Sequence, residues 1–470
     1  FAPGKQWGYF PAGSIAWRIS NEKWMKPIKF ISDLKLRASY GLAGNNRIGN
    51  DLWHNIYRVY SGTSAPAFGN EEYNYYQFAD QTYLYDPDLK WETTITRNIG
   101  LDFGFFRNRL SGTVDVYWNT TKDLLVPSII PNSSGYSRQM TNVGQTSNKG
   151  VEISLDAKII QTKDFQLSAN FNVAFNKNKV DKLATGETEW KTKASLSNWY
   201  GTYNYKMEVG KSMGLIYGFV NDGFYKVDDF DFDATTKKWT LKPGIPDNSS
   251  FSSGNFAFKP GAMKFKKLSD SESNLITEDD MTVIGDTNPK VTGGFGLSGN
   301  WKNLDFTAFF NYMCDFDVLN VNKLYLHSAV RRNYSNLSTD MNLANRFRYV
   351  DDAGVNVSSD PVALAALNEN AKTYSWMSVT QGITMTDLVE DGSFLRLSTL
   401  TVGYTLPKHW LRSLGVKSLR LYFSGSNLFT ITGYSGYDPE VNIQKGLTPG
   451  IDNNVTPRSR VYTVGVNLNF

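Results

Sequence analysis

The residues with the most reactive side chains do not form a catalytic constellation in this sequence. The three histidines, His54, His327 and His409, lie far apart and have no metal-ligand spacing. The acidic pairs Asp228-Asp229 and Asp351-Asp352 fall in expected loops, and nothing in the sequence selects two carboxylates as a glycosidase pair. We therefore predict no catalytic residue, no metal site and no enzyme activity.

Aromatic side chains in the expected loops are better candidates for a binding role. Tyr and Trp rings combine a large contact area with a polar edge, which suits stacking on sugars or anchoring a partner protein. Alternatively, the same rings pack the loops onto one another. The candidates for ligand or partner contact are Trp53, Tyr57, Tyr60, Tyr75, Tyr76, Trp376, Tyr434 and Tyr437.

The elements that would carry these loops are β-strands. From Tyr462 to Phe470 every second residue is apolar, and Thr, Gly and Asn fill the positions between them. Side chains alternate across a strand, so one face is apolar and the other is small and polar. In residues 34–42, Lys35 and Arg37 occupy the polar face, where charges need water. Outer-membrane β-barrels alternate apolar-out and polar-in in this way.

The composition agrees with an all-β chain. Its 470 residues include 26 Tyr, 29 Phe and 12 Trp, and residues of this kind favour strands. No run approaches the roughly 18 apolar residues of a membrane helix. The net charge of +4 without a basic block argues against nucleic acid as a partner. The single cysteine, Cys314, excludes a disulfide framework within the chain.

We predict eleven long strands whose connections alternate between short and long. The strands are expected at 13–20, 34–42, 91–105, 110–118, 150–159, 165–175, 291–301, 304–312, 394–406, 419–425 and 462–470. The long loops are expected at about 44–90, 119–149, 176–290, 313–393 and 426–460. Short turns on one side and long loops on the other are typical of outer-membrane barrels.

An odd number of strands leaves the predicted sheet open. Lipid supplies no hydrogen-bond partners for edge backbone groups, and bacterial single-chain barrels have an even strand count. We therefore expect this chain to supply half of a barrel that other strands close. The sequence starts with Phe1-Ala2-Pro3-Gly4 and shows no signal peptide, so we expect a processed or partial product.

Aromatic residues on the apolar face mark the expected membrane edges. A girdle of such rings flanks the apolar band of membrane barrels at both interfaces. The predicted girdle residues are Trp17, Trp118, Tyr404, Tyr462 and Phe470. Arg97 is the misfit on the apolar face of 91–105, and we expect it near a membrane edge.

Several motifs follow one another along nearly the whole chain. They are LRASYGLAGN at 36–45, LKWETT at 89–94, NIGLDFG at 98–104, NVG at 142–144, NKGVE at 148–152, EDGSFLRL at 390–397, TVGYTLP at 401–407, GSNLF at 425–429 and YDPE at 437–440. In content and order they resemble the SusC/RagA-type TonB-dependent transporters of Bacteroidota outer membranes.

The resemblance implies a fold and a function. It implies a 22-strand barrel of which this chain is the C-terminal half, while the plug, the first barrel strands and the TonB-contacting segment precede this region and are absent from it. It also implies TonB-driven import of a large nutrient, glycan oligomers or peptides, across the outer membrane. The implied partners are the N-terminal plug and barrel half, a SusD-like surface lipoprotein, TonB and the lipid bilayer.

One departure from the family concerns metal binding. Members often carry a calcium-loop-like segment in the loop equivalent to 176–290, and here the corresponding residues are 269–280. Ser269 and Ser273 stand where carboxylates are expected, and only Asp280 keeps its family place. Calcium requires several oxygen ligands at those positions. We expect no cofactor and a solvated acidic loop in place of a calcium site.

Two other functions remain open at this point. The chain could be a passive porin-like barrel, or a surface-exposed β-rich glycan-binding protein without transport. A plug upstream would separate an importer from a porin, and the sorting of short and long loops argues against a soluble binding module. The polarity of the expected lumen does not identify the substrate.

Overall fold

The structure is a computed structural model that describes most of the chain. The described residues are 1–47, 49, 52–54, 57–60, 76–79, 83–136, 138–184, 186–194, 196, 203–251, 258–328, 336–377, 382–411, 415–440 and 446–470. They divide into two compact units, Phe1–Glu189 with Glu208–Lys211 and Trp190–Met207 with Ser212–Phe470. No helix among these residues is both long enough and apolar enough to cross a membrane.

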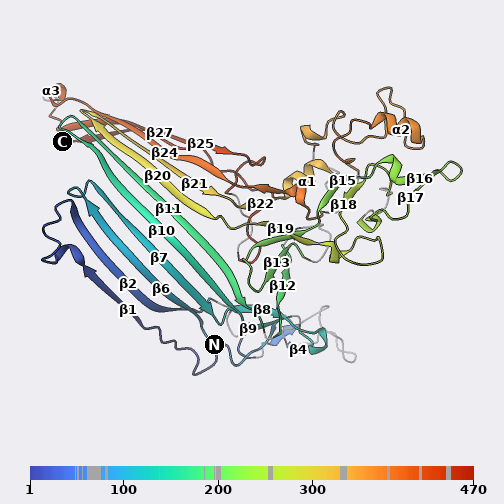
Figure 1. Cartoon of the computed structure of the whole chain (residues 1–470), viewed down its shortest axis with the longest axis horizontal. Helices are drawn as coiled ribbons and strands as arrows, with labels where there is room; N and C mark the ends of the chain where they lie inside the picture. The colour runs from blue at the N-terminus through green and yellow to red at the C-terminus, as the bar shows by residue number, and fades with distance from the viewer. Residues whose placement is uncertain are drawn as a thin grey trace. The chain divides into compact units, whose positions relative to one another are not determined.

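The first unit is built on six long antiparallel strands, drawn from blue to green in Figure 1. In spatial order they are β1 (Ala12–Arg18), β2 (Ile31–Asn45), β6 (Glu92–Phe105), β7 (Leu110–Lys122), β10 (Gln145–Gln161) and β11 (Phe165–Lys182). Sequence neighbours among them are spatial neighbours, which gives an up-and-down meander.

The second unit contains five long antiparallel strands, drawn from yellow to red in Figure 1. In spatial order they are β20 (Val291–Trp301), β21 (Leu304–Cys314), β24 (Phe394–Thr405), β25 (Ser418–Thr432) and β27 (Val461–Asn469). The pairing of β24 with β25 shifts register between Leu397 and Thr399, and Asn427 opposite this shift has a φ of 53°. Positive φ beside a register shift is typical of a β-bulge.

Tight turns join the strands at one end. Between β6 and β7, Phe106, Arg107 and Asn108 all have positive φ, and the Arg109 N–H donates to the Phe105 carbonyl. Between β20 and β21 only two residues remain, and Lys302 takes a φ of 54°. Such turns match the twist of antiparallel strands and keep the connection short.

The long strands of the first unit separate apolar from polar side chains by face. One row across the sheet, in register, is entirely apolar and contains Leu36, Leu101, Val114, Ile153 and Val173. The next row lies on the opposite face and contains Arg37, Gly100, Asp115, Glu152 and Ala174.

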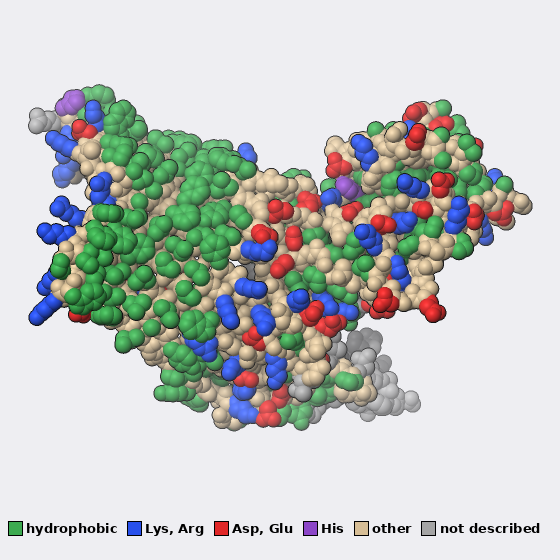
Figure 2. Space-filling view, viewed as in Figure 1, with side chains coloured by type: hydrophobic (Ala, Val, Ile, Leu, Met, Phe, Trp, Pro, Cys, Tyr) green, Lys and Arg blue, Asp and Glu red, His purple; other side chains and the backbone are tan. Residues whose placement is uncertain are grey.

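The apolar faces of both units have no protein covering them among the described residues. Ile15 in the first unit is 73% exposed and Val464 in the second unit is 82% exposed. Figure 2 shows a broad hydrophobic surface over the long strands. Apolar patches of this extent are unfavourable in water, so the faces require an apolar environment such as lipid.

All eleven predicted long strands are present, but several extend further towards the loops than the sequence pattern indicates. For example, β10 begins at Gln145 where the alternation predicts 150, and β11 ends at Lys182 where it predicts 175. The hydrogen-bond ladder continues through polar residues such as Asn148 and Asn178, which pair across these strands. The apolar alternation therefore marks the length of the lipid-facing segment and not the length of the strand.

The first strand is shorter than predicted. β1 ends at Arg18, and Ile19–Asn21 forms a 3-10 turn where the alternation continues the strand to residue 20. The chain then turns towards β2 through hydrogen bonds in which the Glu22 and Met25 N–H groups donate to the Ile19 and Glu22 carbonyls.

The connections in the first unit contain short strands. β3 (Tyr57–Tyr60) pairs with β4 (Tyr76–Ala79), and β5 (Tyr83–Leu84), β9 (Arg138–Asn142) and β8 (Leu125–Ile129) form a three-stranded sheet. Asn142 connects this sheet to the segment just before β6. Its side-chain amide donates to the Lys90 carbonyl at 2.7 Å, and its side-chain oxygen accepts from the Lys90 N–H at 2.7 Å.

The connections in the second unit fold around a core of their own. Their remaining strands are β13 (Tyr205–Glu208), β14 (Leu215–Gly218), β15 (Asn221–Phe224), β16 (Phe230–Asp233), β17 (Lys238–Leu241), β18 (Met263–Phe265), β19 (Thr282–Asp286), β22 (Asp317–Asn320), β23 (Val389–Asp391) and β26 (Ile451–Asp452), with β12 (Glu189–Thr192) at the junction of the two units. Helices of the long connections are α1 (Val321–His327) and α2 (Pro361–Leu367), and Val227–Asp229, Ser249–Phe251, Glu278–Asp280, Thr339–Met341 and Thr386–Leu388 are 3-10 turns. The remaining helix, α3 (Lys408–Leu411), lies in the shorter connection between β24 and β25.

This core brings together residues that are far apart in sequence. One cluster contains four side chains that are each at most 2% exposed: Phe219 directly after β14, Phe265 from β18, Leu324 from α1 and Met385. Burying a large apolar side chain stabilises a fold by about 1.5–3 kcal/mol. The long loops of this unit are therefore a folded layer, which the sequence analysis describes only as loops.

The direction in which the apolar face points can be tested with one pair of substitutions. Ile153 lies in the middle of the apolar row on β10, so Ile153→Arg is expected to cost about 2–4 kcal/mol in barrel stability because the charge would enter lipid. Heat-modifiable gel migration and urea unfolding in lipid vesicles measure this cost. The neighbouring substitution Ser154→Arg, on the polar face, is the control and should change stability little. Equal costs for the two would contradict the assignment of faces.

Candidate functional site

The polar face of the first unit carries an ion-pair network across three strands. Arg37 on β2 donates from Nε to both Asp102 carboxylate oxygens on β6 at 2.9 and 3.0 Å. Its Nη2 reaches the next strand and lies 3.1–3.2 Å from the Asp115 oxygens on β7. Lys35 Nζ is 3.2 Å from Asp102 Oδ2. Lys35 and Arg37 thus occupy the polar face, as the sequence predicts.

Gly100 leaves the space that the Arg37 side chain needs to reach across β6 to Asp115. It lies between Arg37 and Asp115 in the register of the sheet. A Cβ at this position would lie 2.5 Å from Asp115 Oδ1 and 2.6 Å from Arg37 Nη2, which is closer than nonbonded atoms approach. The glycine of the NIGLDFG motif is therefore explained by the space that the arginine needs to cross β6.

The second unit repeats the same arrangement with different residues. Arg420 on β25 crosses β24 and pairs with Asp305 on β21, with Nε donating to Oδ1 at 2.8 Å. Gly403 of the TVGYTLP motif lies beneath the guanidinium, where a Cβ would come within 2.3 Å of Arg420 Nη2. Each unit therefore has an arginine that spans a glycine on the middle strand to reach an aspartate.

A buried ion-pair network joins two of the sequence motifs in the second unit. Arg396 of the FLRL segment is 2% exposed, and its Nη2 donates to Asp438 Oδ1 of the YDPE segment at 2.6 Å. Glu440 Oε2 lies 3.3 Å from the same nitrogen, and Glu440 Oε1 accepts from Arg458 Nη2 at 3.1 Å. The connection that follows β25 is thereby tied both to β24 and to the start of β27.

The ionisation of Asp438 follows from these contacts. Burial opposes ionisation of its carboxyl, but the hydrogen bond from Arg396 and the N–H groups of Glu440 and Arg458 outweigh burial and lower its pKa. Charge-assisted hydrogen bonds of this kind are roughly twice as strong as neutral ones. Asp438 is therefore ionised, and its hydrogen bonds hold the loop in place.

A second network fixes the same connection to the loop core. Glu390 of the EDG segment accepts from the Ser435 N–H at 2.9 Å and the Ser435 hydroxyl at 2.8 Å, and Lys323 Nζ lies 3.3 Å from its Oε1. The Tyr434 hydroxyl donates to Asp452 Oδ2 at 2.9 Å. Residues that are more than a hundred positions apart are therefore held in one rigid assembly.

The predicted contact aromatics have different surroundings. Tyr437 is 84% exposed, whereas Tyr434 is buried with its hydroxyl bound to Asp452. Trp376 is partly buried against the loop core, and Trp53 is half-buried beside the His54 ring at 4.5 Å between centroids. Tyr75 lies outside the described residues. For Tyr57, Tyr60 and Tyr76 the structure describes the backbone in β3 and β4 but not the side chains.

Four of the predicted girdle residues lie on the long strands, and Phe470 directly follows β27. Each is more than a third exposed, and they are Trp17, Trp118, Tyr404, Tyr462 and Phe470. The sequence analysis misses Trp301, which is 58% exposed at the end of β20. Trp301 and Tyr404 line a depression of about 450 Å³ together with Lys302, Asn303 and Leu304. The alternation could have identified Trp301, since it follows Leu297 and Gly299 on the same face.

The residues considered for catalysis have structural partners. Asp229 pairs with Lys264 at 3.5 Å, and Asp351 accepts from the Ala353 and Val355 N–H groups in a turn. Within the described ranges, no three or more His, Cys, Asp or Glu residues are placed to hold a metal ion. None of these contacts assembles a nucleophile with a base.

A recess in the loop layer is a further candidate for contact with a ligand. It has a volume of about 210 Å³ and is lined by Phe224, Lys226, Val227, Asp228, Phe347, Ala365, Asn368, Glu369 and Ala371. Aromatic rings beside charged and amide groups suit a polar organic ligand. The sequence analysis misses this recess because its walls come from segments more than a hundred residues apart.

The segment at 269–280 closes around the Asp280 carboxylate. Asp280 is fully buried and accepts hydrogen bonds from the N–H groups of Leu268, Ser269 and Thr277, each at 2.9 Å, and from Lys267 Nζ at 3.1 Å. Burial opposes ionisation, but these donors outweigh it and lower the pKa of Asp280 to about 2. The carboxylate organises the loop through protein donors.

Comparison with known proteins identifies the family. The family model described as TonB dependent receptor-like, beta-barrel matches residues 2–428. The chain belongs to this family. It is therefore an outer-membrane β-barrel chain, and the family comprises receptors and transporters and not enzymes. The resemblance on which the sequence analysis rests is confirmed.

Individual relatives of this TonB-dependent receptor chain have similar sequences. TonB-dependent receptor P3 of Formosa agariphila is 31% identical over all of this chain and 42% of its own length. TonB-dependent receptor SusC of Bacteroides thetaiotaomicron is 30% identical over all of this chain and 41% of its own length. The chain thus spans less than half the length of the curated relatives that it matches.

Solved structures show the same arrangement. The RagAB peptide importer in its closed-closed state matches all of this chain and 44% of its own chain, with a TM-score of 0.70 and 26% identity. The structure of the RagAB peptide transporter matches 98% of this chain with a TM-score of 0.68 and 26% identity. The overall fold of this chain is therefore similar to that of these solved structures.

The buried Arg396–Asp438 pair should dominate the stability of the loop assembly. Asp438→Asn is expected to cost about 3–5 kcal/mol, because Arg396 would remain charged and buried without its main partner. The control Asp305→Asn breaks a partly exposed pair with Arg420 and should cost about 1 kcal/mol or less. Hydrogen exchange of the amides of Glu440 and Arg458 and urea unfolding report the difference. Similar costs for both variants would contradict the role of burial.

The Asp280 carboxylate should make its loop sensitive to acid. Its folded-state pKa of about 2 lies below the usual 3.8, so its stabilisation is complete above pH 4 and is lost as the pH falls to 2. The difference corresponds to about 2 kcal/mol. Hydrogen exchange of the Leu268, Ser269 and Thr277 amides should accelerate over this pH range. Asp280→Asn should accelerate exchange already at pH 7 and abolish the acid step, and an unchanged pH profile would refute the assignment.

Proposed function

We propose that this chain forms the C-terminal wall and outer loops of an energy-coupled importer for a large nutrient. The nutrient class is glycan oligomers or peptides, and the importer works with a SusD-like surface lipoprotein. The observation that carries the proposal is the match over the whole chain to both SusC and the RagAB peptide importer. The apolar outer face, polar inner face and folded loops are what such an importer needs from this part of the wall.

The polar face would line the passage. The Arg37 and Arg420 networks offer fixed charges with remaining hydrogen-bonding capacity, so that water and polar substrate groups can be solvated along the wall. Because each arginine is paired with an aspartate on another strand, the networks make this face polar without creating a large net electrostatic field. This chain would contribute no covalent chemistry, and substrate movement would be coupled to a plug and to TonB through parts that precede this region.

The loop layer would contribute to capture at the outer surface. Tyr437 is exposed and lies in a loop that the Arg396 and Glu390 networks hold in place. Because this loop is already ordered, contact of a ligand with the Tyr437 ring would cost little conformational entropy. The other aromatic candidates for this role are Trp53, Tyr57, Tyr60, Tyr75, Tyr76 and Trp376, whereas the predicted contact residue Tyr434 is buried with its hydroxyl bound to Asp452 and is not proposed to touch a ligand. Their proposed contacts are with substrate or with the lipoprotein lid.

The predicted girdle residues are proposed to mark the two membrane–water interfaces. Their exposure on the apolar face of the sheet supports this role. Tyr and Trp rings place an apolar body in the lipid and a polar edge among the headgroups. Phe470 would add an apolar ring directly after β27.

The proposed importer needs no bound metal in this chain. Lys267 supplies the positive charge beside Asp280, where a calcium loop would have its cation. Calcium titration of the purified protein should therefore leave hydrogen exchange of the Leu268 and Ser269 amides unchanged. Protection of these amides that rises with calcium would instead assign a metal site to 269–280.

Growth and uptake assays test the import function. A strain that lacks this transporter should fail to grow on one class of polymer, glycan or peptide, and the intact gene should restore growth. Uptake of fluorescent oligomers of that class should stop when a protonophore removes the proton-motive force, and the SusD-like lipoprotein should co-purify. Uptake that continues without the proton-motive force would favour a passive porin-like barrel. Binding without uptake would favour a surface glycan-binding protein.

The contribution of the outer aromatic residue can be measured in the same assay. Tyr437→Ala is expected to lower the apparent affinity for the oligomer by about two- to tenfold, since ring stacking contributes about 0.5–1.5 kcal/mol. Tyr136→Ala, in another loop, is the matched control and should leave uptake unchanged. Unchanged affinity with Tyr437→Ala would remove this ring from the capture site.

A further inference from the structure

The apolar face of the first unit ends in a row of basic and aromatic side chains. In the register of the sheet, Tyr40 on β2 pairs with Arg97 on β6. Lys149 on β10 pairs with Trp118 on β7 and with Lys177 on β11. Arg97 and Trp118 meet across their shared edge, where Arg97 Nη1 donates to the Trp118 carbonyl at 3.5 Å. We name these five residues the basic-aromatic row.

The row lies at a boundary between two environments. The adjacent row on the same face, nearer to the short turns, contains Ala38, Ile99, Val116, Val151 and Phe175 and is wholly apolar. Lys and Arg side chains gather where the hydrophobic surface ends on the side of the loops (Figure 2). The cations are therefore held at the depth where acyl chains give way to lipid headgroups.

The cations of this row lack carboxylate partners. Among the described residues, no ion pair joins Arg97, Lys149 or Lys177 to an acidic group, whereas Arg37 on the opposite face is 2.8–3.1 Å from two aspartates. Lys149 and Lys177 are exposed. Arg97 Nη1 lies 3.3 Å from Thr120 Oγ1, and its guanidinium is 6.0 Å from the centre of the Tyr40 ring. Three positive charges thus point outward and are available to an anionic ligand.

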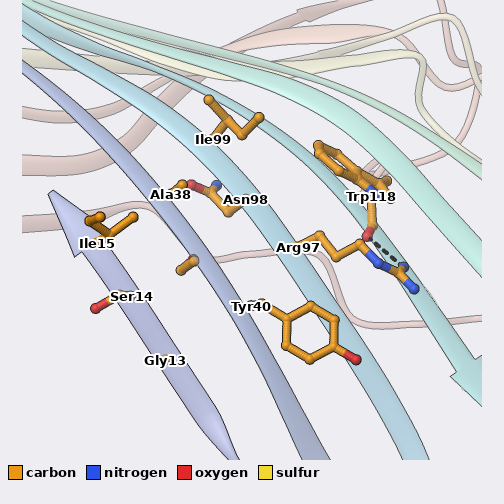
Figure 3. A pocket seen from close by; sticks show the side chains of 10 residues that line it. Gly13, Ser14, Ile15, Ala38, Tyr40, Arg97, Asn98, Ile99 and Trp118 are labelled. Atoms are coloured by element: carbon orange, nitrogen blue, oxygen red, sulfur yellow. Dashed lines mark hydrogen bonds between the residues drawn. The ribbon is translucent and has the colours of Figure 1, made fainter.

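A depression leads from this row onto the apolar surface. It has a volume of about 400 Å³ and is lined by Gly13, Ser14, Ile15, Ala38, Ser39, Tyr40, Arg97, Asn98, Ile99 and Trp118. Figure 3 shows the aliphatic side chains of Ile15 and Ile99 on one side of Tyr40, and Arg97 between Tyr40 and Trp118. Gly13 on β1 has open space above it, so no side chain fills this end. One end of the depression is aliphatic and the other is basic.

We propose that the basic-aromatic row and this depression bind a phosphate-bearing lipid of the outer leaflet. An acyl chain would lie along Ile15 and Ile99, and the phosphates would pair with Arg97, Lys149 and Lys177. Arginine binds phosphate through two parallel N–H donors, and lysines on neighbouring strands about 5 Å apart can share a second phosphate. The apolar row below makes an amphiphile the ligand that fits, because a soluble anion would leave that surface uncovered.

Native mass spectrometry of the complete transporter in detergent tests this proposal. The probes are lipid A bisphosphate, its dephosphorylated form and phosphatidylcholine. The wild-type protein should retain the bisphosphate and bind the other two lipids at least fivefold more weakly. The variant Arg97→Gln with Lys149→Gln and Lys177→Gln should bind the bisphosphate about a hundredfold more weakly, since about 1 kcal/mol for each of the three basic residues near a lipid surface converts to a factor of this order.

A matched control removes the same charge elsewhere. Lys237→Gln with Lys238→Gln and Lys372→Gln changes three exposed loop lysines and should leave lipid binding unchanged. The single substitution Arg97→Lys, with Lys149 and Lys177 unchanged, keeps all three positive charges and should retain most of the lipid binding. Heat-modifiable gel migration confirms that each variant is folded. Equal lipid binding by the triple variant and the wild type, equal loss in the control, or no preference for phosphorylated lipid would overturn the proposal.

Discussion

The fold depends on one constraint, that backbone N–H and C=O groups facing lipid must find partners within the protein. The long strands meet it through continuous antiparallel ladders, such as the pairing of β10 with β11 from Gln145 to Gln161. Since every strand has two faces and only one may contact lipid, the alternation of apolar and polar residues follows from the same requirement. The charged networks can exist only because the opposite face is wet.

Rigidity of the outer layer has a separate origin. The loop segments of the second unit share an apolar core, and ion pairs around Arg396, Asp438 and Glu390 fasten them to the strands. Without these attachments, connections as long as the one between β11 and β20 would lose much conformational entropy on binding a ligand. A preformed surface lowers this entropic cost for any ligand or partner that contacts it.

The sequence predicts the periodic part of the structure well and the remainder poorly. All eleven strands are predictable because alternation is a local signal, and Lys35 and Arg37 are correctly assigned to the polar face. The strand ends are missed, since Asn148 and Asn178 continue the ladder without apolar residues. The Arg396–Asp438 contact is missed because no local pattern shows that two motifs 42 residues apart meet. Burial of Tyr434 depends likewise on Asp452, which lies on another segment.

The arginines that cross a glycine have a consequence for how the sheet is assembled. Arg37 reaches Asp115 only if β2, β6 and β7 are all present and in their native alignment, with Gly100 in the middle. A shift of one strand by one residue would turn the arginine towards lipid and place a side chain where the glycine must be. The Arg37 network therefore forms only when all three strands are in their native register. The Arg420–Gly403–Asp305 arrangement imposes the same requirement in the second unit.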